Sequence, residues 1–104
     1  MKKKLDDNQI IESLSNLSLS WKLDGGFLKK NFKFKSFDNA IQFINIVSVK
    51  CNEIDHHPKW TNIYNTIEVE LNTHDINGIS TLDFELSEFM NITYSKIENN
   101  QTTI

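Results

Sequence analysis

The three histidines of this chain lie within one short stretch, and their spacing points to acid–base chemistry. His56 and His57 are adjacent, and His74 follows a predicted strand. An imidazole has an ordinary pKa of about 6.5, so near neutral pH it can both donate and accept a proton. If a helix end and a strand end bring these side chains to one cleft, they can act there as general acid and general base.

Carboxylates and aromatic rings surround the histidines. Three acids could fix an imidazole tautomer through a hydrogen bond: Asp55, Asp75 and Asp83. Three aromatic side chains could stack on a flat ligand: Trp21, Trp60 and Tyr64. Simpler interpretations stay open, because a histidine pair could merely cap a helix C-terminus, where positive charge is favoured. The aromatic residues could equally belong to a core, and Asp83 could be a helix-start acid.

A metal site is the sharpest competing hypothesis. Three histidines and a carboxylate would suffice for catalytic zinc, but the paired ligand spacing of H-E-x-x-H is absent. Neighbouring His56 and His57 tend to diverge. The single cysteine, Cys51, cannot close an intramolecular disulfide, and its place on an apolar helix face favours a buried thiol. The ligand spacing therefore argues against a metal site.

Composition limits the class of protein. At 104 residues and 12.1 kDa, residues 1–104 form a single domain of ordinary size. With 38% hydrophobic residues in interrupted runs, the chain should not span a membrane. The net charge of −3 and the lack of a basic stripe argue against direct binding of nucleic acid. The first residues lack the apolar run of a secretory signal, so we expect a cytoplasmic location.

The first two helices are predicted from capping residues followed by apolar residues at three- and four-residue steps. Asp7 or Asn8 can cap a first helix that ends near Ser18, because their side-chain oxygens can accept from free amides of the first turn. Ser36 can cap a second helix. Pro58 should end it, because the residue before a proline is disfavoured in the α region.

The strands are predicted from period-two patterns separated by turn residues. A hairpin is expected around Asp24-Gly25-Gly26, because glycine tolerates a positive φ, with a strand of alternating buried residues after it. Ile63, Ile67, Val69 and Leu71 share one parity, which indicates a strand with one wet face. Asn65-Thr66 can split this segment into a second, short hairpin.

A third helix completes the predicted order of helix, two strands, helix, one or two strands, helix. Ser80 can cap it, with Asp83 at the capping-box position, and residues from about Glu98 onward should be frayed. Glycine turns favour antiparallel pairing of neighbouring strands, whereas parallel pairing needs crossovers. The expected fold class is therefore α+β, with helices layered on one sheet face.

Read in order, the residues around the histidines form a long motif: Asp55-His56-His57-Pro58-x-Trp60-x-Asn62-x-Tyr64-Asn65, then Thr73-His74, Gly78-Ile79-Ser80 and Asp83. This motif resembles that of the pterin-4a-carbinolamine dehydratases, also called 4a-hydroxytetrahydrobiopterin dehydratases. The similarity runs from about residue 15 to residue 95. It implies a four-stranded antiparallel sheet with three helices packed on one face, the fourth strand arising from a split at Asn65-Thr66.

The resemblance also implies a reaction and its partners. Family members remove water from 4a-hydroxytetrahydrobiopterin, which gives the quinonoid dihydropterin for tetrahydrobiopterin recycling, and they need no metal or redox cofactor. They are homodimers or homotetramers, and a vertebrate form also acts as the dimerisation cofactor of a homeodomain transcription factor. The expected partners here are therefore a pterin substrate, further copies of the chain and, by family analogy alone, a transcription factor.

Site residues follow from the resemblance by position. It implies a catalytic set of three histidines, in which His56 and His74 transfer protons at the hydroxyl and His57 holds the pterin. The implied pocket is lined by His57, Pro58, Thr73, His74, Asp75 and Ile76, with Asp55 and Asp83 as supporting acids. Asn52 departs from the pattern, because the vertebrate members carry a glutamate there and an amide cannot act as a base. Asp55 could take that role, whereas Glu53 lies about 100° away around the helix.

Two alternatives to this enzyme stay open. The first is a non-catalytic pterin-binding or dimerisation scaffold of the coactivator type. The predicted outer face of the second helix weighs against it, because that face is polar and offers no obvious hydrophobic docking patch: Asp38, Asn39, Gln42, Asn45 and Asn52. The second is a pterin-handling protein whose physiological substrate differs.

Overall fold

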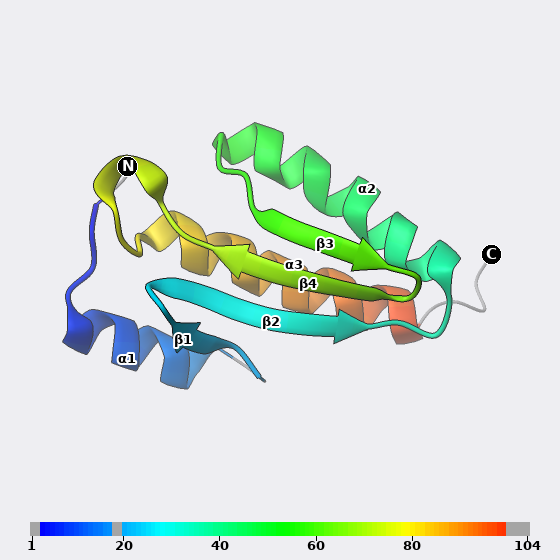
Figure 1. The fold of residues 1–104 in the computed structure, drawn as a ribbon, viewed down its shortest axis with the longest axis horizontal. Coiled ribbons are helices and arrows are strands. Elements are labelled where there is room, and N and C mark those ends of the chain that lie inside the picture. The colour runs from blue at the N-terminus through cyan, green and yellow to red at the C-terminus, as the bar shows by residue number, and fades with distance from the viewer. Residues whose placement is uncertain (1–2, 18–19, 100–104) are drawn as a thin grey trace.

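The computed structural model describes residues 3–17 and 20–99. Its elements, in chain order, are α1 (Asp7–Asn16), β1 (Lys22–Asp24), β2 (Phe27–Lys33), α2 (Phe37–Ile54), β3 (Lys59–Ile63), β4 (Thr66–Leu71), the 3₁₀ helix η1 (His74–Ile76) and α3 (Thr81–Asn99). All strand pairs are antiparallel, in the order β1-β2-β4-β3 (Figure 1). The predicted α+β class, the four strands and the three main helices are confirmed.

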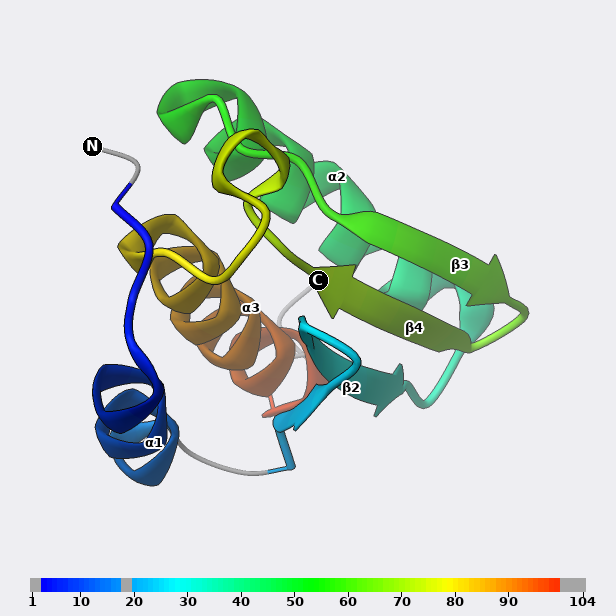
Figure 2. The ribbon, with the colours of Figure 1, turned by 60° about the vertical axis from the view of Figure 1, so that its left-hand side comes forward.

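The helices form one layer beside the sheet, and the core lies between the two layers (Figure 2). Alternation places Leu28 and Phe32 of β2 opposite Leu71 and Ile67 of β4, and all four are buried. From α2 the core receives Phe43, which is fully buried and stacks at 4.9 Å from the ring of Phe32. Burial of such an aromatic side chain contributes about 1.5–3 kcal/mol. The hydrophobic alternation in the sequence therefore fixes which sheet face the helices cover.

The β3–β4 hairpin confirms the predicted split at Asn65-Thr66 and corrects one residue. Ile63, expected to share the buried parity of Ile67, is 59% exposed. Its partner across the hairpin is Thr66, whereas Ile67 faces Asn62. The turn, with Tyr64 at φ 52°, changes the parity between the two strands, so Ile63 lies on the open sheet face.

The helix starts and stops differ from the predictions at two places. Helix α1 is capped by Asp6, not by Asp7 or Asn8, because Gln9 three residues later completes a reciprocal capping box with bonds of 2.8 and 2.9 Å. Ser18 lies outside the described residues, and α1 ends at Asn16. Helix α2 starts at the predicted cap, but it ends at Ile54, before Pro58, because Asp55 adopts the left-handed conformation.

Helix α3 extends further than predicted. Glu98, expected to be frayed, accepts a hydrogen bond from the Lys35 backbone N–H at 3.0 Å and another from the Asn39 side-chain amide at 2.9 Å. These contacts tie the last described turn of α3 to the start of α2, so α3 continues to Asn99. Within the part of the chain that the structure describes, no helix has the length and apolarity to cross a membrane.

Candidate active site

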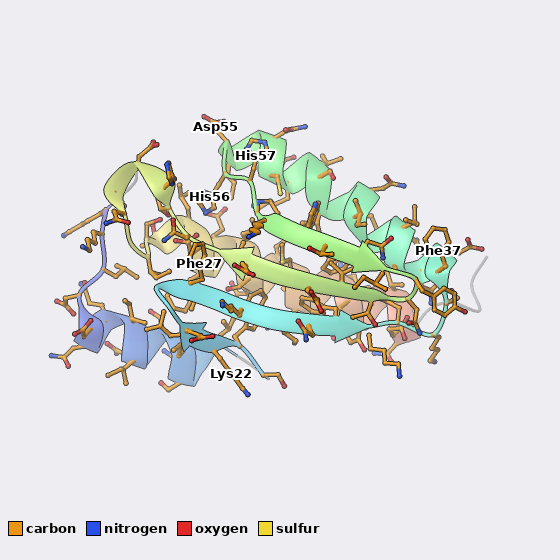
Figure 3. The ribbon with its side chains drawn as sticks, viewed as in Figure 1. Lys22, Phe27, Phe37, Asp55, His56 and His57 are labelled. Carbon is orange, nitrogen blue, oxygen red and sulfur yellow. The ribbon has the colours of Figure 1, made fainter. Side chains whose placement is uncertain are left out.

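Three segments that carry predicted site residues meet at one end of the molecule. They are the connection from α2 to β3, the η1 segment after β4, and the start of α3 (Figures 1 and 2). Figure 3 shows Asp55, His56 and His57 at the first of these segments. Antiparallel pairing explains the convergence, because it returns the end of β4 to the side where β3 begins.

Asp55 immediately precedes the two adjacent histidines and forms the turn that leads into them. Its left-handed backbone (φ 52°, ψ 49°) ends α2, and the following His56 N–H donates to the Cys51 carbonyl at 3.0 Å. As a result, His56 turns inward and is 6% exposed, whereas His57 is exposed. The predicted divergence of the pair is observed, and it gives the two rings different surroundings.

A fully buried carboxylate, Asp83, anchors the inward ring. Its Oδ1 lies 2.6 Å from His56 Nε2. Its Oδ2 accepts from Thr73 Oγ1 at 2.7 Å and from the Ser80 backbone N–H at 2.9 Å. Burying a carboxylate is costly unless donors surround it, so these bonds are what permits Asp83 to lie in the interior.

The donor and acceptor roles in this network can be assigned from its connectivity. A carboxylate only accepts, so the ring N–H of His56 is on Nε2 and Nδ1 is the remaining ring nitrogen. Thr73 gives its hydroxyl proton to Asp83, so Ser80 Oγ must donate to Thr73 Oγ1 across their 2.6 Å contact. Ser80 Oγ in turn accepts from the Leu82 N–H at 3.2 Å. Each bond of this network thus has one donor and one acceptor, with the His56 ring donating from Nε2.

The outward ring borders a cavity. His57 Nε2 lies 3.0 Å from Asn52 Oδ1, one helical turn back on α2. A cavity of about 320 Å³ between α2 and the start of β3 is lined by Ser48, Cys51, Asn52, His57, Pro58 and Trp60. Its wall includes one indole ring and several hydrogen-bonding groups, the mixture typical of a site for a flat polar ligand. A second cavity, of about 260 Å³ between α1 and α3, contains no predicted site residue.

The thiol in the cavity wall is poorly suited to act as a nucleophile near neutral pH. Burial raises the pKa of Cys51 to about 11, although a hydrogen bond with its backbone acts in the opposite direction. Cys51 therefore stays protonated near neutral pH and packs as a small apolar side chain, 2% exposed, as the sequence indicated.

The remaining predicted residues lie on the η1 side. Thr73 is buried beside Asp83, while His74 and Asp75 are exposed and Ile76 is half-buried. Of the pocket lining that the motif implied, His57 and Pro58 border the 320 Å³ cavity, and the η1 residues do not. The structure thus joins Thr73 and His56 through Asp83 and leaves His74 beside that network, next to Thr73 in the chain.

Two members of this region were not predicted as site residues. Ser80 was expected only as a helix cap, yet its backbone and hydroxyl both belong to the Asp83 network. The capping-box spacing of Ser80 and Asp83 was the available signal, but it does not show that the cap is buried. Ser48 lines the cavity without any signal in the sequence. Among the described residues, no group of three His, Cys, Asp or Glu side chains is arranged to hold a metal ion.

Comparison with known sequences identifies what this geometry is similar to. The family model described as Pterin 4 alpha carbinolamine dehydratase matches residues 3–93. A protein of Synechococcus sp. (strain WH7803), named "Putative pterin-4-alpha-carbinolamine dehydratase", is 42% identical over 76 residues, which are 73% of this chain and 82% of that protein. A protein of the same name from Mesorhizobium japonicum is 39% identical over 92 residues, or 86% of this chain and 93% of that protein. The resemblance stated from the histidine motif is confirmed.

Solved structures agree with these matches. The transcriptional coactivator/pterin dehydratase from Brucella melitensis superposes with a TM-score of 0.84 at 34% identity, covering 88% of this chain and 99% of that one. A pterin dehydratase-like protein identified as a RuBisCO assembly factor in the alpha-carboxysome superposes with a TM-score of 0.64 at 16% identity, covering 73% of this chain and 90% of that one. The second likeness concerns the fold alone.

Proposed function

The chain belongs to the pterin-4a-carbinolamine dehydratase family, and from this premise we propose that it removes water from 4a-hydroxytetrahydrobiopterin to give the quinonoid dihydropterin. The observation that carries the proposal is the buried Asp83 network, which anchors His56 and joins the two segments that carry the exposed His57 and His74. Recycling of tetrahydrobiopterin is the corresponding physiological role.

The reaction needs two proton transfers and no change of oxidation state. The bond between C4a and the hydroxyl oxygen breaks as that oxygen takes a proton and leaves as water. A ring nitrogen of the pterin loses a proton, and its electron pair forms the new double bond to C4a. Hydroxide is a poor leaving group, so a positioned general acid is needed, and such groups typically contribute about 10²–10⁴-fold each.

The histidines divide these tasks by their surroundings. In our proposal, His56 and His74 transfer protons at the 4a-hydroxyl, with Asp83 as a positioning residue that orients His56. His57 holds the pterin, together with Pro58. Thr73, Asp75 and Ile76 line the η1 side of the same site, and Asp55 supports the histidine pair by shaping the turn that leads into it.

Asn52 cannot serve as the base in this site, but it orients the ring of His57. Its amide oxygen accepts from His57 Nε2, so the ring carries its N–H toward Asn52 and leaves Nδ1 as an acceptor. A neutral amide cannot remove a proton from the substrate. We infer that His57 Nδ1, and not residue 52, accepts a substrate hydrogen bond in the cavity.

The test is to mix the purified chain with freshly generated 4a-hydroxytetrahydrobiopterin and follow its loss in the ultraviolet against the spontaneous rate. Acceleration that His56→Ala and His74→Ala both lose would support the dehydratase and its acid–base pair. Near-parental rates in a folded His74→Ala variant would refute its assigned role. No acceleration by folded parent protein would refute the enzyme.

The alternative is a non-catalytic scaffold, and a contact between copies of the chain would be compatible with either function. The outer face of α2 is less polar than the sequence suggested, because Val49 and Ile46 are 60% and 37% exposed among the predicted polar residues. Exposed apolar side chains on one helix face are candidates for a protein contact.

We expect homodimers or homotetramers to form through this face of α2. A shift to monomers in Val49→Asp, measured by light scattering, would support it, and an unchanged mass would exclude this face.

A further inference from the structure

The segment Lys4-Leu5, here called the strap, is joined to the chain just before α3. The Leu5 N–H donates to the Ile79 carbonyl at 2.8 Å, and Lys4 forms an isolated antiparallel bridge with Ser80. Figures 1 and 2 both show the strap running alongside this segment before the chain enters α1. The strap therefore forms an isolated β-bridge with residues next to the candidate site.

Side chains add to the backbone pairing. Leu5 packs against the hydrophobic core, and Ile79 beneath it is 3% exposed. The aliphatic part of Lys4 lies on Gly78, since a Cβ added at Gly78 would come within 2.8 Å of Lys4 Cε and 3.2 Å of its Cγ and Cδ. An alanine at Gly78 would therefore require the flexible side chain of Lys4 to shift away from this segment.

The strap completes the anchoring of the loop that carries His74. Residues 74–77 connect Thr73 and Gly78, whose backbones pair through bonds of 2.8 and 3.4 Å. On the inner side, Asp83 holds Thr73 and Ser80. On the outer side, the strap holds residues 78–80. The loop is thereby fixed on its inner side by Asp83 and on its outer side by the strap, which lies far from it in the sequence.

We propose that Lys4 and Leu5 are positioning residues for the dehydration, because they hold the loop of His74 in its working geometry. The inference rests on the proposed function. A group that transfers protons must lie within about 0.5 Å of its productive place, so an anchor of its loop affects rate without touching substrate. Neither residue was a candidate in the sequence, since the segment precedes the first helix and contains no group suited to the reaction.

The first test compares Leu5→Pro with Leu5→Ala in the full chain. Both variants lose the side chain, but only proline also removes the N–H that donates to Ile79. We expect kcat/KM for dehydration to be about 3- to 10-fold lower in Leu5→Pro than in Leu5→Ala, the factor for one hydrogen bond. Amide exchange at Thr73 should accelerate in parallel. Ile97→Val, a core change at the other end of α3, controls for lost stability and should leave kcat/KM unchanged.

The second test is a double-mutant cycle, which remains informative if Leu5→Pro fails to fold. Gly78→Ala should lower kcat/KM in the parent and at least about 2-fold less in a Lys4→Ala background, where the obstructing side chain is gone. Equal effects in both backgrounds, or equal kcat/KM in the two Leu5 variants, would overturn the strap while the dehydratase stands. An inactive, folded parent would instead refute the proposed function, and with it the catalytic role of the strap.

Discussion

Replacing Asp83 by asparagine tests the reasoning about the buried network directly. An asparagine offers one acceptor oxygen and one donor amide in place of two carboxylate oxygens. Two donors, the Thr73 hydroxyl and the Ser80 N–H, converge on the Oδ2 position, and one donor, the His56 ring, faces Oδ1. The asparagine oxygen should therefore occupy the Oδ2 position, because it satisfies two donors there. Its NH₂ group then points at His56 Nε2.

This arrangement forces His56 to change tautomer. A ring nitrogen that faces an N–H must be an acceptor, so the proton moves from Nε2 to Nδ1. The variant also loses a hydrogen bond to a charged group, worth about 1.5–3 kcal/mol. For a domain of this size, 1 kcal/mol corresponds to about 4–8 °C in Tm, so a decrease of about 6–24 °C is expected. If His56 acts in proton transfer, the wrong tautomer should lower the dehydration rate by about 10²-fold or more.

Two measurements and one control separate these effects. Nitrogen-15 NMR of the imidazole rings identifies which nitrogen of His56 carries the proton, and thermal unfolding gives Tm. Glu88→Gln removes one negative charge from an exposed position of α3 and should change Tm little. An unchanged tautomer with parental Tm would refute the network as described. A changed tautomer with a parental rate would refute only the role of His56 in catalysis.

Three further predictions concern a buried thiol, a partly buried lysine and the turn before the histidine pair. Burial raises the pKa of Cys51 to about 11, so the unfolded chain releases the thiol proton at lower pH than the folded chain, and the free energy of unfolding should fall as pH rises from about 8.5 to about 11. Urea unfolding across this range should show the fall, and Cys51→Ala should lack the part of it that comes from the thiol. Burial lowers the pKa of Lys30, so its contribution to the free energy of unfolding should increase as pH rises through its folded pKa toward about 10.4. Lys30→Met should remove this increase in the same titration, and an unchanged pH dependence in the variant would contradict the prediction. Asp55→Gly should raise the free energy of unfolding by up to about 1 kcal/mol, since glycine adopts the left-handed conformation without strain; a decrease would show that the Asp55 side chain stabilises the turn.

The element order was predictable because local signals and long-range packing agree in this chain. Phe43 and Val47 of α2 follow helical spacing, and Leu28 and Phe32 of β2 follow a spacing typical of strands, so each pattern indicates its own element. Ile63 was misassigned because residues on both sides of the β3–β4 turn share one parity in the sequence but not in space. The number of residues in a hairpin turn decides whether odd-numbered or even-numbered residues of the second strand face the core, so the pattern of the first strand does not simply continue.

The candidate site was predictable as a set of residues but not as an arrangement. Motif similarity singled out His56, His57 and Asp83, yet it could not indicate that a left-handed residue would turn one ring inward and the other outward. The cap of α1 at Asp6 shows the same limit, because neighbouring acids compete for the cap and only the position of Gln9 decides between them.

The buried carboxylate links folding to the site in a way that exposed acids could not. The donors to Asp83 come from the connection after α2, from the end of β4 and from the start of α3. Removing a carboxylate from water is unfavourable until such donors surround it, so the stable state of Asp83 requires all three segments together. The same requirement fixes the ring of His56 and the position of Thr73, from which the His74 loop begins. A chain of this size can thus place acid–base groups from separate segments, because burial of the Asp83 carboxylate requires hydrogen-bond donors from all of them. The strap then holds only the outer side of the loop that carries His74.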